Sequence, residues 1–378
     1  MKKNYTIYLS ILLLVSCVST NSIGLKQVSE FSDTYWDELA ELVSGLPLSE
    51  KNQFRKIFES SRYKTYAKKI DTAWKLAEKN YVSIVRDWKK ENLGNLESPN
   101  VCFYPLSGVD FINFYQFCET APKFIMVGLQ KPGFLTNPNN INEQELYRAY
   151  ASIESIVFEI AGLNYSTSRR MENESKNPHF TGIAPVILIF AKRYGFKIHS
   201  LKQVIMNENG LIVESNDSIK GHQGVQIHMS KNGDEFAREL NFFKIYLTNE
   251  SFEKSTPEGN YLNAQGRLNI VLKSSEYILQ LPEYEKFLRK LLIKTDRVVQ
   301  DESGIPFNYY DEKEWERKVF GTYIGRIELK RTPKVPFQTD LDQEFKKGAG
   351  KLPFFYGYGV LKGKDKSNLL FLKRKALP

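Results

Sequence analysis

The chain has 378 residues, of which 42% are hydrophobic and 13% aromatic, and it carries a formal net charge of +9 at pH 7. These values exclude a disordered chain, because they allow a sizeable core in one large or two ordinary domains. The basic residues are spread along the chain without an arginine-rich arm, so we predict no nucleic-acid partner. A basic surface attracts anionic lipid or polysaccharide, but a plain solvated surface is the simpler explanation of the charge.

The amino terminus carries the pattern of an export signal. Lys2 and Lys3 precede an apolar run, Ile7 to Val15, that is too short to span a bilayer. The Leu-Val-Ser-Cys string ending at Cys17 resembles a bacterial lipobox, in which cleavage leaves the cysteine first and lipid is attached to it. We therefore predict a signal peptide over residues 1–16, which leaves a charge of +7, and several acyl chains on Cys17 that anchor the protein to a membrane. The alternative is an ordinary secreted protein.

Composition then divides the remaining chain. Residues 17–30 are small and polar, as in a tether, and residues 31–95 place apolar and aromatic side chains at three- and four-residue steps, as in amphipathic helices. Gly, Asn, Ser and Pro become frequent before residue 100, so we assign residues 100–378 to an α/β body. The predicted location is the bacterial cell envelope.

Residues 101–130 predict the start of a parallel sheet. Two nearly continuous apolar runs, Val101 to Leu106 and Phe124 to Leu129, are typical of strands covered on both faces, and a helix from Asp110 to Phe117 supplies the crossover. We predict a mixed, largely parallel, Rossmann-like α/β sheet with an amino-terminal helical segment. Further along, we expect helices over 142–161 and from residue 183, two helical pieces over 268–294, and strands over 196–206, 211–213, 224–229, 242–248 and 368–372.

Two cysteines remain in an oxidising compartment once Cys17 is lipidated. Cys102 begins the first strand, and Cys118 ends the helix that folds back over it. Four strand residues and about eight helical residues span similar lengths, ~13 Å and ~12 Å, so a disulfide is geometrically feasible. The alternative is a pair of buried free cysteines.

The turn Ser107-Gly108-Val109-Asp110 is the first candidate site, because open α/β sheets bind ligands at the carboxyl ends of their strands. In a structural interpretation, Gly108 permits the turn and Asp110 caps the helix through a backbone N–H. In a functional one, Asp110 is a catalytic or ligand carboxylate, and Ser107 and the helix amides hold an anion.

A second candidate site is the turn from Gln300 to Pro306, where Asp301 and Glu302 precede Ser303. One of two adjacent acids can serve as a general base while the other raises its pKa, whereas a plain acidic turn is the structural interpretation. Lys273 either presents its cation to a ligand or extends along the surface. Our candidate catalytic residues are thus Asp110 and Asp301, and our candidate binding residues are Ser107, Gly108, Lys273 and Ser303.

The usual catalytic motifs are absent from the sequence. It contains no Gly-x-Ser-x-Gly, His-Glu-x-x-His, Cys-x-x-Cys or P-loop string, and its four histidines lack the spacing of metal ligands. We therefore predict neither a metal nor a cofactor.

Several of these segments resemble a family of uncharacterised bacterial proteins that are predicted to be exported. The shared features are the turn from Tyr104 to Phe111 and the Asp-x-Ser-Gly-Ile-Pro turn from Asp301 to Pro306, together with Gly128-Leu129, Gly182, Pro185, Lys273-Ser274, Leu352 to Phe354 and Gly357-Tyr358. The resemblance covers about residues 35–375 and implies one shared fold without an assigned activity. The start of the sheet is also similar to that of class I methyltransferases, at the level of fold alone.

Two functions follow as hypotheses. The first is a membrane-anchored envelope lipoprotein that binds a ligand or maintains the envelope. The alternative is a hydrolase or transferase that acts on an envelope glycan, lipid or peptide, with Asp110 and Asp301 in one cleft. Convergence of these side chains in the folded protein would favour the enzyme.

Overall fold

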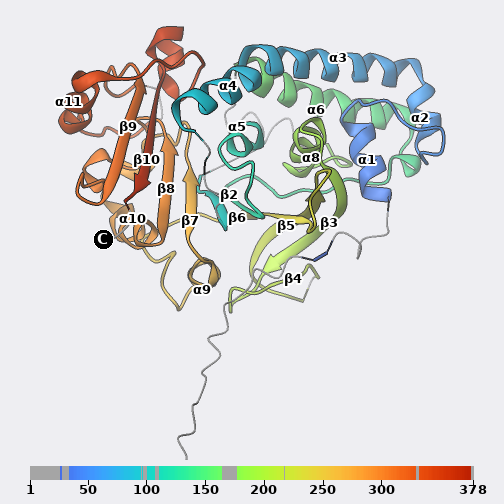
Figure 1. The fold of residues 1–378 in the computed structure, drawn as a ribbon. Helices are drawn as coiled ribbons and strands as arrows, with labels where there is room; N and C mark the ends of the chain where they lie inside the picture. The colour runs from blue at the N-terminus through green and yellow to red at the C-terminus, as the bar shows by residue number, and fades with distance from the viewer. Residues whose placement is uncertain are drawn as a thin grey trace, which may run out of the picture.

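A computed structural model describes residues 26–27, 34–94, 96, 100–106, 110–163, 177–216, 218–328 and 332–375. Within them, one mixed ten-stranded sheet runs in the order β4-β3-β5-β6-β2-β1-β7-β8-β10-β9, with helices on both faces (Figure 1). The strands are β1 (Val101–Tyr104), β2 (Lys123–Gly128), β3 (Lys197–Met206), β4 (Ile212–Glu214), β5 (His222–Ser230), β6 (Arg238–Lys244), β7 (Leu268–Val271), β8 (Thr295–Gln300), β9 (Trp315–Gly321) and β10 (Asn368–Arg374). The predicted mixed α/β class is confirmed.

The sheet is only partly parallel. Its centre, β6-β2-β1-β7-β8, is parallel, whereas β3, β4 and β5 on one side and β9 and β10 on the other are joined by antiparallel pairings. Four of the nine strand pairings are parallel, so the prediction of a largely parallel sheet is wrong. Antiparallel neighbours such as β3 and β4 need only a short turn, and such hairpins widen the sheet without crossover helices.

The order of the strands brings three loops together. From β1 the chain moves to β2 on one side, and after β6 it returns to β7 on the other side of β1. Because β1, β7 and β8 are parallel neighbours, their carboxyl ends lie at one edge of the sheet. In α/β sheets, the crevice outside such an edge is the usual place for a ligand.

Helices cover the two faces of the sheet separately. One face is covered by α1 (Tyr35–Val43), α3 (Ser61–Ala77), α4 (Ser83–Asn92), α5 (Phe111–Gln116), α6 (Glu143–Leu163) and α8 (Ala184–Arg193), with the short α2 (Arg55–Glu59) before α3 (Figure 1). The other face carries α9 (Pro257–Ala264), α10 (Glu285–Ile293) and α11 (Thr339–Gly348). Alternate residues of β1 divide between them: Cys102 and Tyr104 join the first core, and Val101 and Phe103 join the second.

The amino-terminal helical segment is part of this fold. A π-helical stretch, Glu78–Val82, links α3 to α4, and Trp88 of α4 donates from its indole N–H to the Lys351 carbonyl at 2.9 Å. Its aromatic side chains belong to or pack against the first core: Tyr63, Tyr66, Tyr81 and Trp88 are buried, and Tyr35, Trp36 and Trp74 are partly buried. No helix in the described ranges is both long and apolar enough to cross a bilayer.

One predicted element is of the wrong type. Residues 268–294 were expected to form two helical pieces, but the first, Leu268–Val271, is strand β7 at the centre of the sheet, and only α10 is a regular helix. The four residues of this strand are all buried and three of them are apolar, so they show no period that separates a strand from a helix. The sequence interpretation made no prediction for β8 and β9.

Candidate functional site

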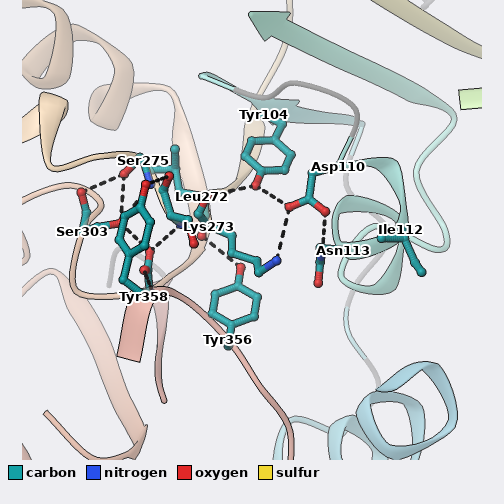
Figure 2. Close-up of polar contacts among 12 residues, drawn as sticks. Tyr104, Asp110, Ile112, Asn113, Leu272, Lys273, Ser275, Ser303, Tyr356 and Tyr358 are labelled. Carbon is teal, nitrogen blue, oxygen red and sulfur yellow. Dashed lines mark hydrogen bonds and ion pairs between the residues drawn. The ribbon is translucent and has the colours of Figure 1, made fainter. Parts of the chain in front are cut away.

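Charged side chains from three strand ends meet at the carboxyl edge of the sheet. Asp110 lies between β1 and α5, Lys273 follows β7, and Asp301 follows β8. Figure 2 shows the Lys273 side chain extending between the rings of Tyr104 and Tyr356, with its ammonium group directed toward Asp110. The predicted residues Asp110, Lys273 and Asp301 therefore belong to one cluster.

Asp110 forms the exposed end of this cluster. Its Oδ2 lies 3.7 Å from the Lys273 Nζ and 3.0 Å from the Tyr104 hydroxyl, while its Oδ1 accepts a hydrogen bond from the Asn113 side chain. The Asp110 side chain is 21% exposed, whereas that of Lys273 is 4% exposed. The carboxylate makes no capping bond to the backbone of α5, so the interpretation of Asp110 as a helix cap is wrong.

Asp301 forms the buried end of the cluster. It accepts three hydrogen bonds, from the Ser274 N–H at 3.1 Å, the Ser303 hydroxyl at 2.8 Å and the Tyr358 N–H at 3.3 Å. Burial raises the pKa of Asp301 to about 6, and these donors and Lys273 oppose the rise. Since all three partners donate, the site is built for the ionised carboxylate.

Gly357 lets the chain approach Asp301 closely. Its φ is +71°, and a Cβ at this position would lie 2.2 Å from the Asp301 Oδ2. Only glycine has both the conformational freedom and the lack of a side chain that this contact requires.

Lys273 carries the positive charge between the two acids. Burial lowers the pKa of Lys273, and the nearby Asp110 and Asp301 carboxylates oppose this shift. With Lys273 protonated and both acids ionised, the cluster has one positive and two negative charges. It therefore presents a net negative charge at its exposed end, Asp110, which disfavours the anion cradle considered for this turn.

Serine side chains tie the loop after β7 to the loop after β8. The Ser275 N–H donates to the Ser303 hydroxyl oxygen at 2.9 Å, and the Ser275 hydroxyl donates to the Ser303 carbonyl at 2.7 Å. Ser303 is fully buried, and its hydroxyl is engaged by Asp301. This serine positions Asp301 within the fold, and the ligand-binding role predicted for it remains a prediction.

The adjacent acids Asp301 and Glu302 have separate environments. Glu302 accepts a hydrogen bond from the Tyr277 hydroxyl at 3.0 Å, and the same hydroxyl oxygen accepts one from the Ile327 N–H at 2.7 Å. Burial and the neighbouring Asp301 raise the pKa of Glu302 to about 8. Glu302 is thus mainly neutral at pH 7, so it adds little negative charge beside Asp301.

Backbone strain is concentrated at this edge of the sheet. Among the described residues, the non-glycine positions with positive φ follow either β1 or β7, and they are Leu106 (φ 61°), Ser274 (φ 54°), Glu276 (φ 56°) and Tyr277 (φ 58°). Such conformations cost about 1–3 kcal/mol each and are common at functional sites.

The remaining predicted residues have different outcomes. Ser107, Gly108 and the lipidation site Cys17 lie outside the described residues. A disulfide joins Cys102 to Cys118, with 6.2 Å between their Cα atoms, and fastens the end of α5 to β1.

Three of the four histidines form ordinary polar pairs in the described part of the chain. His199 bonds to Ser230 at 2.7 Å, His228 to Ser200 at 3.0 Å and His222 to Glu258 at 3.1 Å. No group of three or more potential metal ligands is found among the His, Cys, Asp and Glu residues that the structure describes.

The sequence interpretation missed the tyrosines of the site. Tyr104 contacts Asp110, Tyr356 donates to the Leu272 carbonyl at 2.9 Å, and Tyr358 donates to the Ser274 carbonyl at 2.8 Å. The signal was present in two segments already selected, Tyr104 to Phe111 and Gly357-Tyr358. Nothing in their spacing indicated that both contact the segment after β7.

Comparison of the chain with protein-family models, curated proteins and solved structures finds no match.

Proposed function

We propose that this chain is a lipid-anchored protein of the bacterial cell envelope that binds a hydroxyl-bearing ligand at Asp110 and acts on it as a hydrolase or transferase. The convergence of Asp110, Lys273 and Asp301 at one sheet edge carries the enzymatic part. The envelope location is supported by the charged start, the short apolar run and the lipobox-like string that ends at Cys17.

The energetic cost of the cluster supports a functional role. A buried ion pair often contributes no more stability than apolar residues of similar size, because both charges must be removed from water. Here a nearly buried lysine has two carboxylate neighbours, and strained residues such as Leu106 and Ser274 follow the same strands. Perturbed ionisable groups and strain at a ligand-binding edge are typical of an active site.

The geometry suggests a role for each group. Asp110 is the most exposed acid of the cluster, so it can accept a hydrogen bond from a ligand hydroxyl and act as the general base that removes its proton. Lys273 and the Tyr104 hydroxyl hold one oxygen of that carboxylate in place. Asp301 lies deeper and orients Lys273 by electrostatic attraction.

We also propose that the fold is Rossmann-like, with a start similar to that of the methyltransferases. Along the chain, the five parallel strands appear in the order β1, β2, β6, β7, β8. Across the sheet they lie in the order β6-β2-β1-β7-β8, that is third, second, first, fourth and fifth, which matches the doubly wound order. Dinucleotide-binding sheets of this kind use an acid after the second strand to hold ribose hydroxyls. Leu129 and Gln130 occupy that place here, so the proposal names no nucleotide.

A ligand screen with isosteric variants tests the proposed function. The mature chain carrying Cys17→Ser is screened by thermal shift against envelope glycans, lipids, peptides and S-adenosylmethionine, and hits are assayed for turnover. We expect a ligand that raises the melting temperature of this protein but not of its Asp110→Asn variant, and turnover that the variant lacks.

The matched control is Asp296→Asn, which changes an exposed acid at the opposite end of β8. It should keep both the thermal shift and the turnover. Equal responses of the Asp110→Asn variant and the parent protein to every ligand would refute the role of Asp110.

A further inference from the structure

A pocket of about 620 Å³ opens beside the turn that carries Asp301. It lies between the segments that follow β7 and β8 and the start of α11. Its volume is within the range of about 300–1,000 Å³ that is usual for small-ligand sites. The lining combines two aromatic rings, Tyr309 and Phe337, with the polar side chains of Gln280, Asn308, Gln338 and Asp340.

Phe337 offers an open ring in a fixed orientation. The residue is 55% exposed, yet its ring packs on Tyr323 with centroids 5.4 Å apart and an interplanar angle of 39°. Gly325 lies beneath the same ring, since a Cβ at that position would be 3.1 Å from the Phe337 Cε2. A ring held in this way loses little conformational freedom when a ligand packs on it.

The charges around the pocket favour a neutral ligand. Within the described chain, the lining includes the acids Glu285 and Asp340 and neither lysine nor arginine, which disfavours anions. A cation is disfavoured at the other ring, because the Arg289 guanidinium lies 5.5 Å from the Tyr309 ring and pairs with Glu285 at 2.8 Å. An uncharged ligand is repelled neither by the acids of the lining nor by the Arg289 guanidinium.

The pocket wall is hydrogen-bonded to the turn that carries Asp301. The Gln280 and Gln338 side chains both donate to the main-chain oxygen of Glu302, at 2.7 and 3.2 Å. Gln338 also accepts a hydrogen bond from the Phe307 N–H at 2.7 Å. Glu302 adjoins Asp301 in the chain, so the wall is attached to the turn that carries Asp301.

We propose that this pocket is a binding site for neutral sugar rings of a glycan. A pyranose has an apolar C–H face that packs on an aromatic ring, here Phe337. Its hydroxyls both donate and accept, which suits the Asp340 carboxylate and the Asn308 amide. The proposal that this pocket binds sugar does not depend on the proposed function, but a role of the pocket as a substrate subsite rests on that function.

Calorimetric titration with neutral oligosaccharides of glucose and of N-acetylglucosamine tests the proposal on the mature chain carrying Cys17→Ser. We expect at least one series to bind and the Phe337→Ala variant to bind at least tenfold more weakly, whereas Phe337→Tyr should retain binding. The matched control is Phe236→Ala, which removes an aromatic ring of similar exposure, 48%, next to β6 and outside the pocket. Melting temperatures of all variants check that they fold.

Absence of oligosaccharide binding, or equal affinity of the Phe337→Ala variant and the parent protein, would overturn the sugar site. The Asp110→Asn variant separates this proposal from the proposed function. Sugar binding that depends on Phe337, with no ligand response or turnover that depends on Asp110, would support the pocket and refute the enzyme. The reverse result would refute the pocket alone.

Discussion

Lys273 shows how one residue can join three strand ends. Its side chain is 4% exposed and lies 3.7 Å from Asp110, and the Asp301 carboxylate contributes to its electrostatic environment. Removing the ammonium group would leave Asp301 buried without a compensating charge. Such an uncompensated charge is far more costly than an exposed broken ion pair.

The Lys273→Met variant tests this description. We expect the free energy of unfolding to fall by about 3–5 kcal/mol, because a buried carboxylate loses its cation. Urea denaturation measures the change. Lys318→Met provides the control, since Lys318 forms an exposed pair with Glu316 and should contribute less than about 1 kcal/mol. Equal losses in the two variants would contradict the buried charge cluster.

Glu302 predicts a pH dependence of stability. Burial and Asp301 raise its pKa from an ordinary value of 4.5 to about 8, so the folded state holds a proton that the unfolded chain releases above 4.5. The contribution of Glu302 to stability is full below that value and is lost as the pH rises through about 8. Across this window the slope approaches 1.4 kcal/mol per pH unit.

The Glu302→Gln variant keeps an oxygen to accept the Tyr277 hydroxyl bond but carries no titrating proton. Chemical denaturation between pH 5 and about pH 8 should give a flatter stability profile for this variant than for the parent chain. Parallel profiles would show that Glu302 is ionised in the folded protein throughout.

The candidate residues were accessible to sequence reasoning, but their arrangement was not. Asp110 follows a recognisable apolar run, and Asp301 stands out as one of two adjacent acids in a turn. That Lys273 joins them depends on β7 lying between β1 and β8. The four residues of β7 do not reveal this order, because pairing between strands that are far apart in the sequence sets it.

Among the elements, helices were the easier to predict. The helix expected from residue 183 is α8, with Pro185 in its first turn. α3 and α4 have long repeating apolar patterns, whereas β8 and β9 are short and were not distinguished from the surrounding turns. Charged residues interrupt both strands, Asp296 and Arg297 in β8 and Glu316 to Lys318 in β9, so neither gives a continuous apolar run or a strict alternation.

The disulfide is the covalent link within the β1–α5 unit. Cys102 and Cys118 are 16 positions apart, so the bond closes a short loop that contains the Asp110 turn. We expect the Cys102→Ser, Cys118→Ser double variant to lose about 3 kcal/mol of unfolding free energy, because the unfolded chain gains freedom. Guanidinium denaturation measures this, with the parent protein in reductant as a second comparison. Unchanged stability of the double variant would show that the link adds nothing.

For the whole molecule, the proposed anchor makes a prediction about location. Cells that express the full chain with Cys17→Ser should release the protein from the membrane fraction and fail to incorporate a labelled fatty acid into it. Cys118→Ser should keep the label, because that cysteine is paired inside the fold. Retention of the label by the Cys17→Ser variant would contradict lipid attachment at this residue.

The position of β10 has a consequence for the order of folding. β10 is the last of the described strands in the chain, yet it lies between β8 and β9 and pairs with both. Until β10 has been synthesised and released, β8 and β9 each have an open hydrogen-bonding edge. This side of the sheet therefore cannot fold stepwise during synthesis, and a chain that stops before Asn368 would be prone to aggregate.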